Sequence, residues 1–224
     1  MKTTLAVCIA AVALLAVGAG QAQATVLFDF EGDPPGVDGW YRFGGGTLDF
    51  GHAPGLGSSG DGIFYVTDIN ETLWGGAVKS PDLPSVGIDL STYTGFSADV
   101  QLSVDGLDPQ YPGPGPQVEL MLNLPGYLEW AAITVLPLDG SWQTISEDFA
   151  NLTPQSAATD PITLEQLQNP SLEIRVILRN LNRDPGDPYG KVRMRMDTVT
   201  AFPEPTSLAL LGLGGLALLR RRRK

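Results

Sequence analysis

Cysteine and histidine are almost absent from this chain, which has one of each, Cys8 and His52, among 224 residues. A single cysteine cannot form an intrachain disulfide, and zinc sites built from cysteine and histidine are excluded by count. A Ser-His-Asp triad would have to use His52, which lies in a glycine-rich segment without a nucleophile elbow. We therefore expect stability to come from a large core or a metal ion, and no triad chemistry.

Basic residues are also scarce, since 14 Lys and Arg stand against 25 Asp and Glu, for a net charge of −11. Such an acidic chain does not suit nucleic acid or anionic membranes, whereas it suits calcium, which prefers oxygen ligands. The alternative is that the acids are simply solvated. Six basic residues cluster late in the chain, where we expect pairing with carboxylates on neighbouring strands, the alternative being contact with an acidic polymer. They are Arg175, Arg179, Arg183, Lys191, Arg193 and Arg195.

Long hydrophobic runs occur only at the two ends. Lys2, an apolar run over residues 5–17 and the small-residue site Ala22-Gln23-Ala24 follow in the order typical of a secretory signal peptide, which predicts cleavage after Ala24. At the other end, residues 207–219 form an apolar stretch of thirteen residues, followed by five positive charges. A relaxed transmembrane helix needs about twenty residues. We expect a transient stop-transfer segment, with a plain C-terminal anchor as the alternative.

The C-terminal end resembles a known sorting signal. Pro203-Glu204-Pro205, the apolar stretch and the arginine cluster occur in the order of the PEP-CTERM sorting tail of Gram-negative bacteria. The resemblance implies recognition by an exosortase, cleavage near Pro203, Glu204 and Pro205, and transient contact with the inner membrane during export by the secretion machinery. It implies a destination at the cell envelope surface or in the extracellular matrix. It implies an address and no activity.

Residues 25–202 remain for one domain, and their hydrophobic residues recur with period two. Alternating segments predict strands over residues 96–104, 117–124, 172–179 and 192–197, with shorter candidates at 26–31, 63–67, 76–79, 127–135 and 141–145. Glycine, proline and aspartate clusters separate them, and Thr163 with Gln166 forms a capping box for one short helix. We expect an all-β sandwich with one short helix, flanked by an N-terminal signal helix (residues 1–24) and a C-terminal apolar helix (residues 203–224).

Several motifs of this middle region resemble the galactose-binding-like jelly roll of carbohydrate-binding modules and laminin-B-type domains. The motifs are Phe28-Asp29-Phe30-Glu31-Gly32 before Gly39-Trp40, Gly140-Ser141-Trp142-Gln143 and Met196-Asp197-Thr198-Val199. The resemblance implies a structural calcium ion between Glu31 and Asp197, with Asp29 and Asp61 as further ligands. The alternative for Asp197 is a solvent-facing position, continuing Arg193 and Arg195, which the periodicity favours.

The four tryptophans, Trp40, Trp74, Trp130 and Trp142, are the remaining candidates for binding. Aromatic rings stack on the apolar faces of sugars, and Trp40, Tyr41 and Trp74 lie beside glycine-rich segments that leave room for a flat ligand. The alternative is that these rings belong to the core. In the resembled fold Trp142 is structural.

The sequence therefore favours a non-enzymatic, exported structural or interaction protein, with a carbohydrate-binding module for an extracellular polysaccharide as the alternative. A glycoside-cleaving enzyme is the least favoured class, because no pair of carboxylates stands out by its spacing. Exposed tryptophans would favour the binding module, and buried ones the structural role.

Overall fold

The computed structural model describes residues 24–31, 37–43, 47–68, 74–105, 116–179 and 191–203. The predicted signal peptide up to residue 23, Glu204, Pro205 and the apolar C-terminal segment lie outside the described residues, as does the side chain of Trp74. None of the helices in these ranges is long and apolar enough to cross a membrane. Residues Val26–Ala201 form a compact unit, and the predicted domain limits at residues 24 and 203 stay predictions.

The described chain is built almost entirely from strands. The strands are β1 (Thr25–Phe28), β2 (Tyr41–Phe43), β3 (Thr47–Ala53), β4 (Gly62–Asp68), β5 (Trp74–Lys79), β6 (Gly95–Asp105), β7 (Gln117–Leu124), β8 (Leu128–Val135), β9 (Asp139–Asp148), β10 (Thr153–Ser156), β11 (Glu173–Arg179) and β12 (Lys191–Phe202). The short helices are η1 (Leu83–Val86), η2 (Leu90–Thr92), η3 (Phe149–Asn151) and α2 (Leu164–Leu167).

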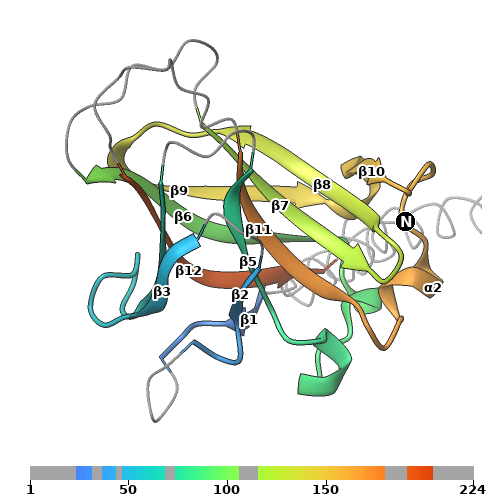
Figure 1. Cartoon of the computed structure of the whole chain (residues 1–224). Helices are drawn as coiled ribbons and strands as arrows, with labels where there is room; N and C mark the ends of the chain where they lie inside the picture. Colours follow the sequence, from blue (N-terminus) through green and yellow to red (C-terminus); the bar gives the residue numbers. More distant parts are fainter. Residues whose placement is uncertain are drawn as a thin grey trace, which may run out of the picture. The chain divides into compact units, whose positions relative to one another are not determined.

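Two antiparallel sheets form the sandwich. Sheet A has the order β3-β4-β12-β6-β9, with β1 pairing to β12, and sheet B has the order β10-β8-β7-β11-β5-β2. In Figure 1, β7, β8 and β11 lie in front of β6, β9 and β12. Apart from the β3–β4 and β7–β8 pairs, neighbouring strands are not consecutive in sequence, as in a jelly roll, and the predicted all-β sandwich is confirmed. The capping box is also present, because the Thr163 hydroxyl accepts from the Gln166 amide while the Gln166 side chain accepts from the Thr163 amide.

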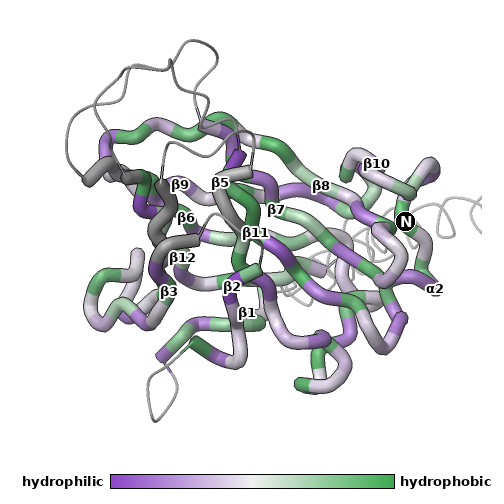
Figure 2. The backbone as a smooth tube through the Cα atoms, in the orientation of Figure 1, coloured by the Kyte–Doolittle hydropathy of each residue, from purple (hydrophilic) through white to green (hydrophobic). Residues whose placement is uncertain are grey.

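The core lies between the sheets and follows from the two-residue period, which puts every second side chain on one face. Hydrophobic and hydrophilic residues alternate along the strands in Figure 2. The inward residues of the central strands are fully buried, among them Val100 of β6, Leu120 of β7, Val176 of β11 and Met194 of β12. Burial of this kind stabilises by about 1.5–3 kcal/mol for each large aliphatic side chain.

Three edge strands were not predicted from the sequence. One is β3 at the edge of sheet A, where Gly51 and His52 were interpreted as part of a glycine-rich segment, and the others are β2 and β10. β2 has three residues, too few for an alternating pattern to emerge. β10 contains Pro154, which cannot donate a ladder hydrogen bond and argues against a strand. Both β2 and β10 lie at the edges of sheet B, where a short length and a proline are tolerated.

Trp40 lies in the core, at 2% exposure. Its ring meets Phe28 edge-on with 5.4 Å between centroids, and Phe30 at 6.0 Å. Phe30 adopts a positive φ of 59°, and its amide donates to the carboxylate of Asp38 at 2.9 Å. The prediction of a surface ring at Trp40 is therefore wrong, because Phe28 and Phe30 pack against the ring and bury it.

Replacing Trp40 tests this placement. We expect Trp40→Ala to lower the free energy of unfolding by about 3–5 kcal/mol, the usual cost of deleting a core aromatic. The neighbouring Tyr41, 44% exposed, is the matched control, and Tyr41→Ala should change stability by no more than about 0.5 kcal/mol. Denaturant unfolding of both variants measures the difference. Equal stability of the two variants would contradict the assignment of Trp40 to the core.

Candidate functional site

The outer face of sheet B carries side chains in transverse rows. Pairing places Tyr41 opposite Lys79, Lys79 opposite Arg175, Arg175 opposite Met121, and Met121 opposite Ala131. Because directly opposite residues of neighbouring strands project to the same face, these five form one line across β2, β5, β11, β7 and β8. The line runs from an aromatic ring at the edge strand, through two cations, to apolar residues.

An ionic network surrounds the middle of this row. Arg175 Nε donates to Glu173 Oε1 at 2.7 Å, and its Nη1 donates to Glu129 Oε1 at 3.1 Å. Lys79 Nζ and Asn123 Nδ2 also donate to Glu173, at 2.7 and 2.8 Å. Glu129, Glu173 and Arg175 are only 5–8% exposed. Buried charges are tolerated when they are paired and hydrogen-bonded in this way, so the network holds the side chains of four strands in one arrangement.

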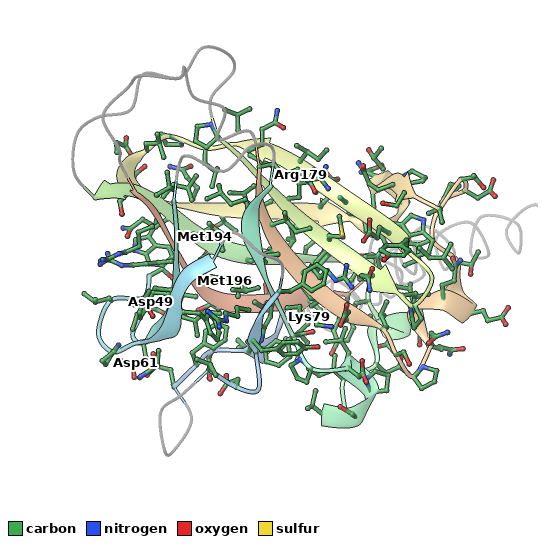
Figure 3. All side chains as sticks on the ribbon, viewed as in Figure 1. Asp49, Asp61, Lys79, Arg179, Met194 and Met196 are labelled. Carbon is green, nitrogen blue, oxygen red and sulfur yellow. The ribbon has the colours of Figure 1, made fainter. Side chains whose placement is uncertain are left out.

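A second pair lies in the neighbouring rows. Glu119, 1% exposed, forms an ion pair with Arg179 at 2.8 Å between Oε2 and Nε. Burial raises the pKa of Glu119, the Arg179 guanidinium opposes this rise, and Glu129 adds to it. Figure 3 labels Lys79 and Arg179, which lie toward opposite ends of the face. The expected pairing of the late basic cluster with carboxylates on neighbouring strands is confirmed for Arg179, whereas Arg175 pairs with Glu173 of its own strand and with Glu129 on β8, two strands away.

Two aromatic rings border the network at the β2 edge. Lys79 Nζ lies 4.6 Å from the centre of the Tyr41 ring, and the Arg175 guanidinium carbon lies 4.4 Å from that of Phe43. Burial lowers the pKa of Lys79, whereas hydrogen bonds to Glu173 and Tyr41 raise it, and the net shift is upward. Lys79 therefore stays charged at neutral pH and holds the Tyr41 ring by a cation–π contact.

Side chains near the two edges of this face are exposed to solvent, whereas those in its middle are buried. Tyr41 is 44% exposed on β2, and on β8 Ile133 and Val135 are 46% and 49% exposed. Between them Met121 and Ile177 are at most 1% exposed. A ligand lying across the strands would contact the rings and the β8 side chains, and the buried network would hold these contacts in place.

Of the predicted binding residues, Tyr41 has its side chain on this face. Trp40 lies in the core, and the backbone of Trp74 lies opposite Arg179 in β5. Phe43, Lys79 and the three glutamates were missed, because polar residues at every second position were interpreted as a solvated face. Opposite charges on neighbouring strands were the available signal. The acidic residues are Glu119, Glu129 and Glu173, and the basic residues are Lys79, Arg175 and Arg179.

The predicted calcium ligands lie at a different place, on sheet A. Asp197 is fully buried, so its solvent-facing alternative is wrong. Its Oδ2 accepts from the Ser59 amide and the Ser58 hydroxyl, each at 2.9 Å, and its Oδ1 accepts from the Thr198 amide at 2.7 Å. A positive φ of 37° at Thr198 interrupts the alternation that had favoured a solvent-facing Asp197.

Glu31 is held by the same loop as Asp197. Its Oε1 accepts from the Asp61 amide, in the loop between β3 and β4. Glycines permit this approach, because a Cβ on Gly60 would lie 1.7 Å from Glu31 Oε1 and one on Gly57 would lie 2.8 Å from Asp197 Oδ2. The loop thus brings both predicted ligands to one segment of backbone.

The buried carboxylate of Asp197 is satisfied by hydrogen bonds without a cation, since amide and hydroxyl groups donate to its two oxygens. Within the described ranges, no group of three or more His, Cys, Asp or Glu side chains could hold a metal ion. Calcium prefers six to eight oxygen ligands. The loop carbonyls and the hydroxyls of Ser58 and Ser59 would have to complete the set. Calcium binding by Glu31 and Asp197 stays a prediction.

Thermal unfolding tests this prediction. If calcium binds the native state alone, a hundredfold excess over its dissociation constant adds roughly 2.7 kcal/mol and raises the melting temperature. Glu31→Gln should abolish the rise, because it keeps an acceptor for the Asp61 amide and removes the charge. Glu165→Gln, at an exposed carboxylate of α2 that is no predicted ligand, is the matched control and should leave the rise unchanged. Identical melting curves in calcium and in chelator would contradict calcium binding.

Known proteins resemble the two parts of the chain separately. Residues 203–224 match the family model of the PEP-CTERM protein-sorting motif. No curated protein matches the sequence. The fold is similar to that of CBM27-1 from Caldicellulosiruptor saccharolyticus, solved in complex with mannohexaose, at 13% identity and a TM-score of 0.50, over 82% of this chain and 98% of that one.

A family 11 carbohydrate-binding module, from the cellulosomal cellulase Lic26A-Cel5E of Clostridium thermocellum, gives 16% identity and a TM-score of 0.47, over 82% and 96% of the two chains. These likenesses concern the fold. The chain thus carries a PEP-CTERM protein-sorting motif after a jelly-roll β-sandwich of the kind found in carbohydrate-binding modules, and the motif indicates an exported protein that is sorted for the cell surface.

Proposed function

We propose that this protein is displayed at the cell surface or in the extracellular matrix, where it binds an uncharged polysaccharide on the outer face of sheet B. The observation that carries the proposal is the exposed Tyr41 ring, fixed by Lys79 at the edge of a buried ionic network. Sugars present apolar C–H faces and hydroxyl groups. The face offers an aromatic ring for the first and charged donors for the second.

Stability alone is a weak reason for the buried network. Replacing a buried ion pair by apolar residues of similar volume is often neutral or stabilising. The network therefore supports a role in positioning. Glu129 and Glu173 hold the Arg175 guanidinium over the Phe43 ring, and Glu173 also accepts from Lys79. A preorganised surface loses less conformational entropy when it binds a ligand.

The charge balance of the face favours an uncharged glycan. Each of its three described cations is paired with a carboxylate, namely Lys79 with Glu173, Arg175 with Glu129 and Glu173, and Arg179 with Glu119. The face adds no net charge to a chain whose net charge is −11, so an acidic polymer would be repelled.

The same pairing supports a non-catalytic role. Glycoside hydrolysis needs one carboxyl group that gives up its proton and a second that attacks or activates water. Glu119, Glu129 and Glu173 are instead each bound to an arginine or a lysine and at most 5% exposed. We infer that this face holds a polysaccharide without cleaving it. A structural role with no glycan ligand is the competing account, and the burial of Trp40 and Trp130 favours it.

Retention on polysaccharide gels separates these accounts. We expect wild-type protein to be retarded on gels containing β-mannan or mixed-linkage β-glucan. Tyr41→Ala should weaken binding about tenfold, since an aromatic contact is worth about 0.5–1.5 kcal/mol beyond its area. Tyr127→Ala removes an equally large ring that is 72% exposed in the β7–β8 turn, and it should bind like the wild type. Unretarded migration of the wild type on both neutral gels would leave the structural role.

Processing of the tail is tested on protein from the native host. We propose that an exosortase recognises Pro203, Glu204 and Pro205 and that the inner membrane holds the apolar segment only transiently. Mass spectrometry of surface material should then find neither residues 1–24 nor the five C-terminal charges. Pro203→Ala with Pro205→Ala should leave the tail in place. Wild-type surface protein ending in Lys224 would contradict processing.

A further inference from the structure

A second row of planar side chains crosses the other side of the sandwich, on the outer face of sheet A. Trp142 of β9 lies opposite Gln101 of β6, and Gln101 Oε1 accepts from Arg195 Nη1 of β12 at 2.8 Å. Arg195 lies opposite Phe64 of β4, which lies opposite Gly51 of β3. Trp142 is therefore on the outer face of the sheet and partly exposed.

Gln101 holds this row in place. It is 8% exposed, and its Nε2 donates to the carbonyl of Gly140 at 2.5 Å while its Oε1 accepts from Arg195. Gly140 has a φ of 78°, a conformation that suits glycine, two residues before Trp142. One amide thus ties the start of the Trp142 strand to the Arg195 guanidinium, and Gln101 acts as a positioning residue.

Rings stand at both ends of the row, with a guanidinium between them. The Phe64 ring lies against the bare backbone of Gly51, where an added Cβ would be 3.3 Å from its Cε1. Trp142 on β9 and Phe64 on β4 are three strand spacings apart in sheet A. With neighbouring strands about 4.7–4.9 Å apart, the two strands that carry these rings are about 14 Å apart. This arrangement suits an extended chain that repeats an apolar face and hydrogen-bonding groups.

The chemistry of the row favours a polysaccharide over a protein partner. The core of a protein interface needs well-exposed apolar side chains. The large hydrophobic residues that are exposed in the described ranges all lie off this row, for example Val26, Leu56 and Val86. Trp142, Arg195 and Phe64 are partly exposed, and the first two offer a ring face and N–H donors.

The charge of the whole chain favours an uncharged ligand at this row. Asp99 lies two residues before Gln101 on β6, where its carboxylate accepts from the Ser58 and Thr144 hydroxyls. The buried Asp197 lies two residues after Arg195 on β12. Arg193, two residues before Arg195, lies on the same face with its guanidinium carbon 5.9 Å from the centre of the Phe64 ring, so this face carries charges of both signs. The net charge of −11 of the whole chain nevertheless opposes an acidic polymer, whereas the sugar hydroxyls of a neutral one carry no charge.

We propose that the Trp142–Arg195–Phe64 row is a second polysaccharide-binding surface, on the opposite side of the sandwich from Tyr41. The two surfaces belong to different sheets, so one molecule can hold two separate chains. Cross-linking of two polysaccharide chains by one molecule rests on the proposed function of the sheet B face. Binding at the second surface is independent of that proposal. Two surfaces on one rigid domain also increase retention by avidity in a network of chains.

A bridging assay tests the proposal with the full chain. Protein is bound to an insoluble β-mannan or mixed-linkage β-glucan gel, and capture of the same polysaccharide in soluble, fluorescent form is measured. We expect wild-type protein to capture the soluble chain. Trp142→Ala should keep gel binding through sheet B and lose at least about nine tenths of the capture, which is a tenfold loss of affinity or about 1.4 kcal/mol. Alginate is the acidic control and should not be captured.

Matched variants keep the outcomes separate. Trp142→Phe retains a ring and should restore capture, and the melting temperature of Trp142→Ala shows whether the fold persists. Full capture by a folded Trp142→Ala variant would overturn the second surface while leaving the sheet B proposal intact. Loss of gel binding in Trp142→Ala with none in Tyr41→Ala would support the sheet A surface and remove the sheet B proposal. No gel binding by the wild type would overturn both.

Discussion

The burial of Arg175 between Glu129 and Glu173 is the constraint on which the outer face of sheet B depends. Three charged groups of β8 and β11, which lie on either side of β7, are 5–8% exposed, and each is stable there only while its partners stay in register. A shift of one residue in β11 would turn Arg175 into the core and expose Val176. The network therefore fixes the pairing of the central strands more strictly than apolar contacts alone would, and it sets the positions of Lys79 and the aromatic rings.

The outer faces of both sheets combine aromatic rings with hydrogen-bonded cations, but the partners of the cations differ. On the outer face of sheet B, Lys79, Arg175 and Arg179 are each paired with a carboxylate, and the exposed ring is at the edge strand. On sheet A, the guanidinium of Arg195 meets a neutral amide, and rings lie at both ends of the row. The balance of charge on the outer face of sheet B agrees with an uncharged ligand there. A protein that is sorted for the cell surface and holds neutral chains on both sides would suit a matrix component.

Sequence periodicity predicted much of the fold because burial of one face dominates strand formation. The limits of β7, residues 117–124, and the Thr163 capping box were predicted to the residue. Prediction failed where local chemistry overrides the alternation. Asp197 is buried because Ser58 and Ser59, from a distant loop, satisfy its carboxylate. Trp40 is buried because Phe28 and Phe30 enclose it. The sheet B network needed strand order, which no pattern along a single strand contains.

The central claim is that a polysaccharide lies across the outer face of sheet B, against a preformed network. Its most direct test is amide chemical-shift mapping of the ¹⁵N-labelled protein during titration with the oligosaccharide of whichever neutral polysaccharide retains it. The account predicts that shifts concentrate at Tyr41, Phe43 and Lys79 on this face, with a second group near Trp142, while Arg175 stays hydrogen-bonded to Glu173. Saturating shifts confined to residues outside both faces, with Tyr41 and Lys79 unmoved, would contradict it.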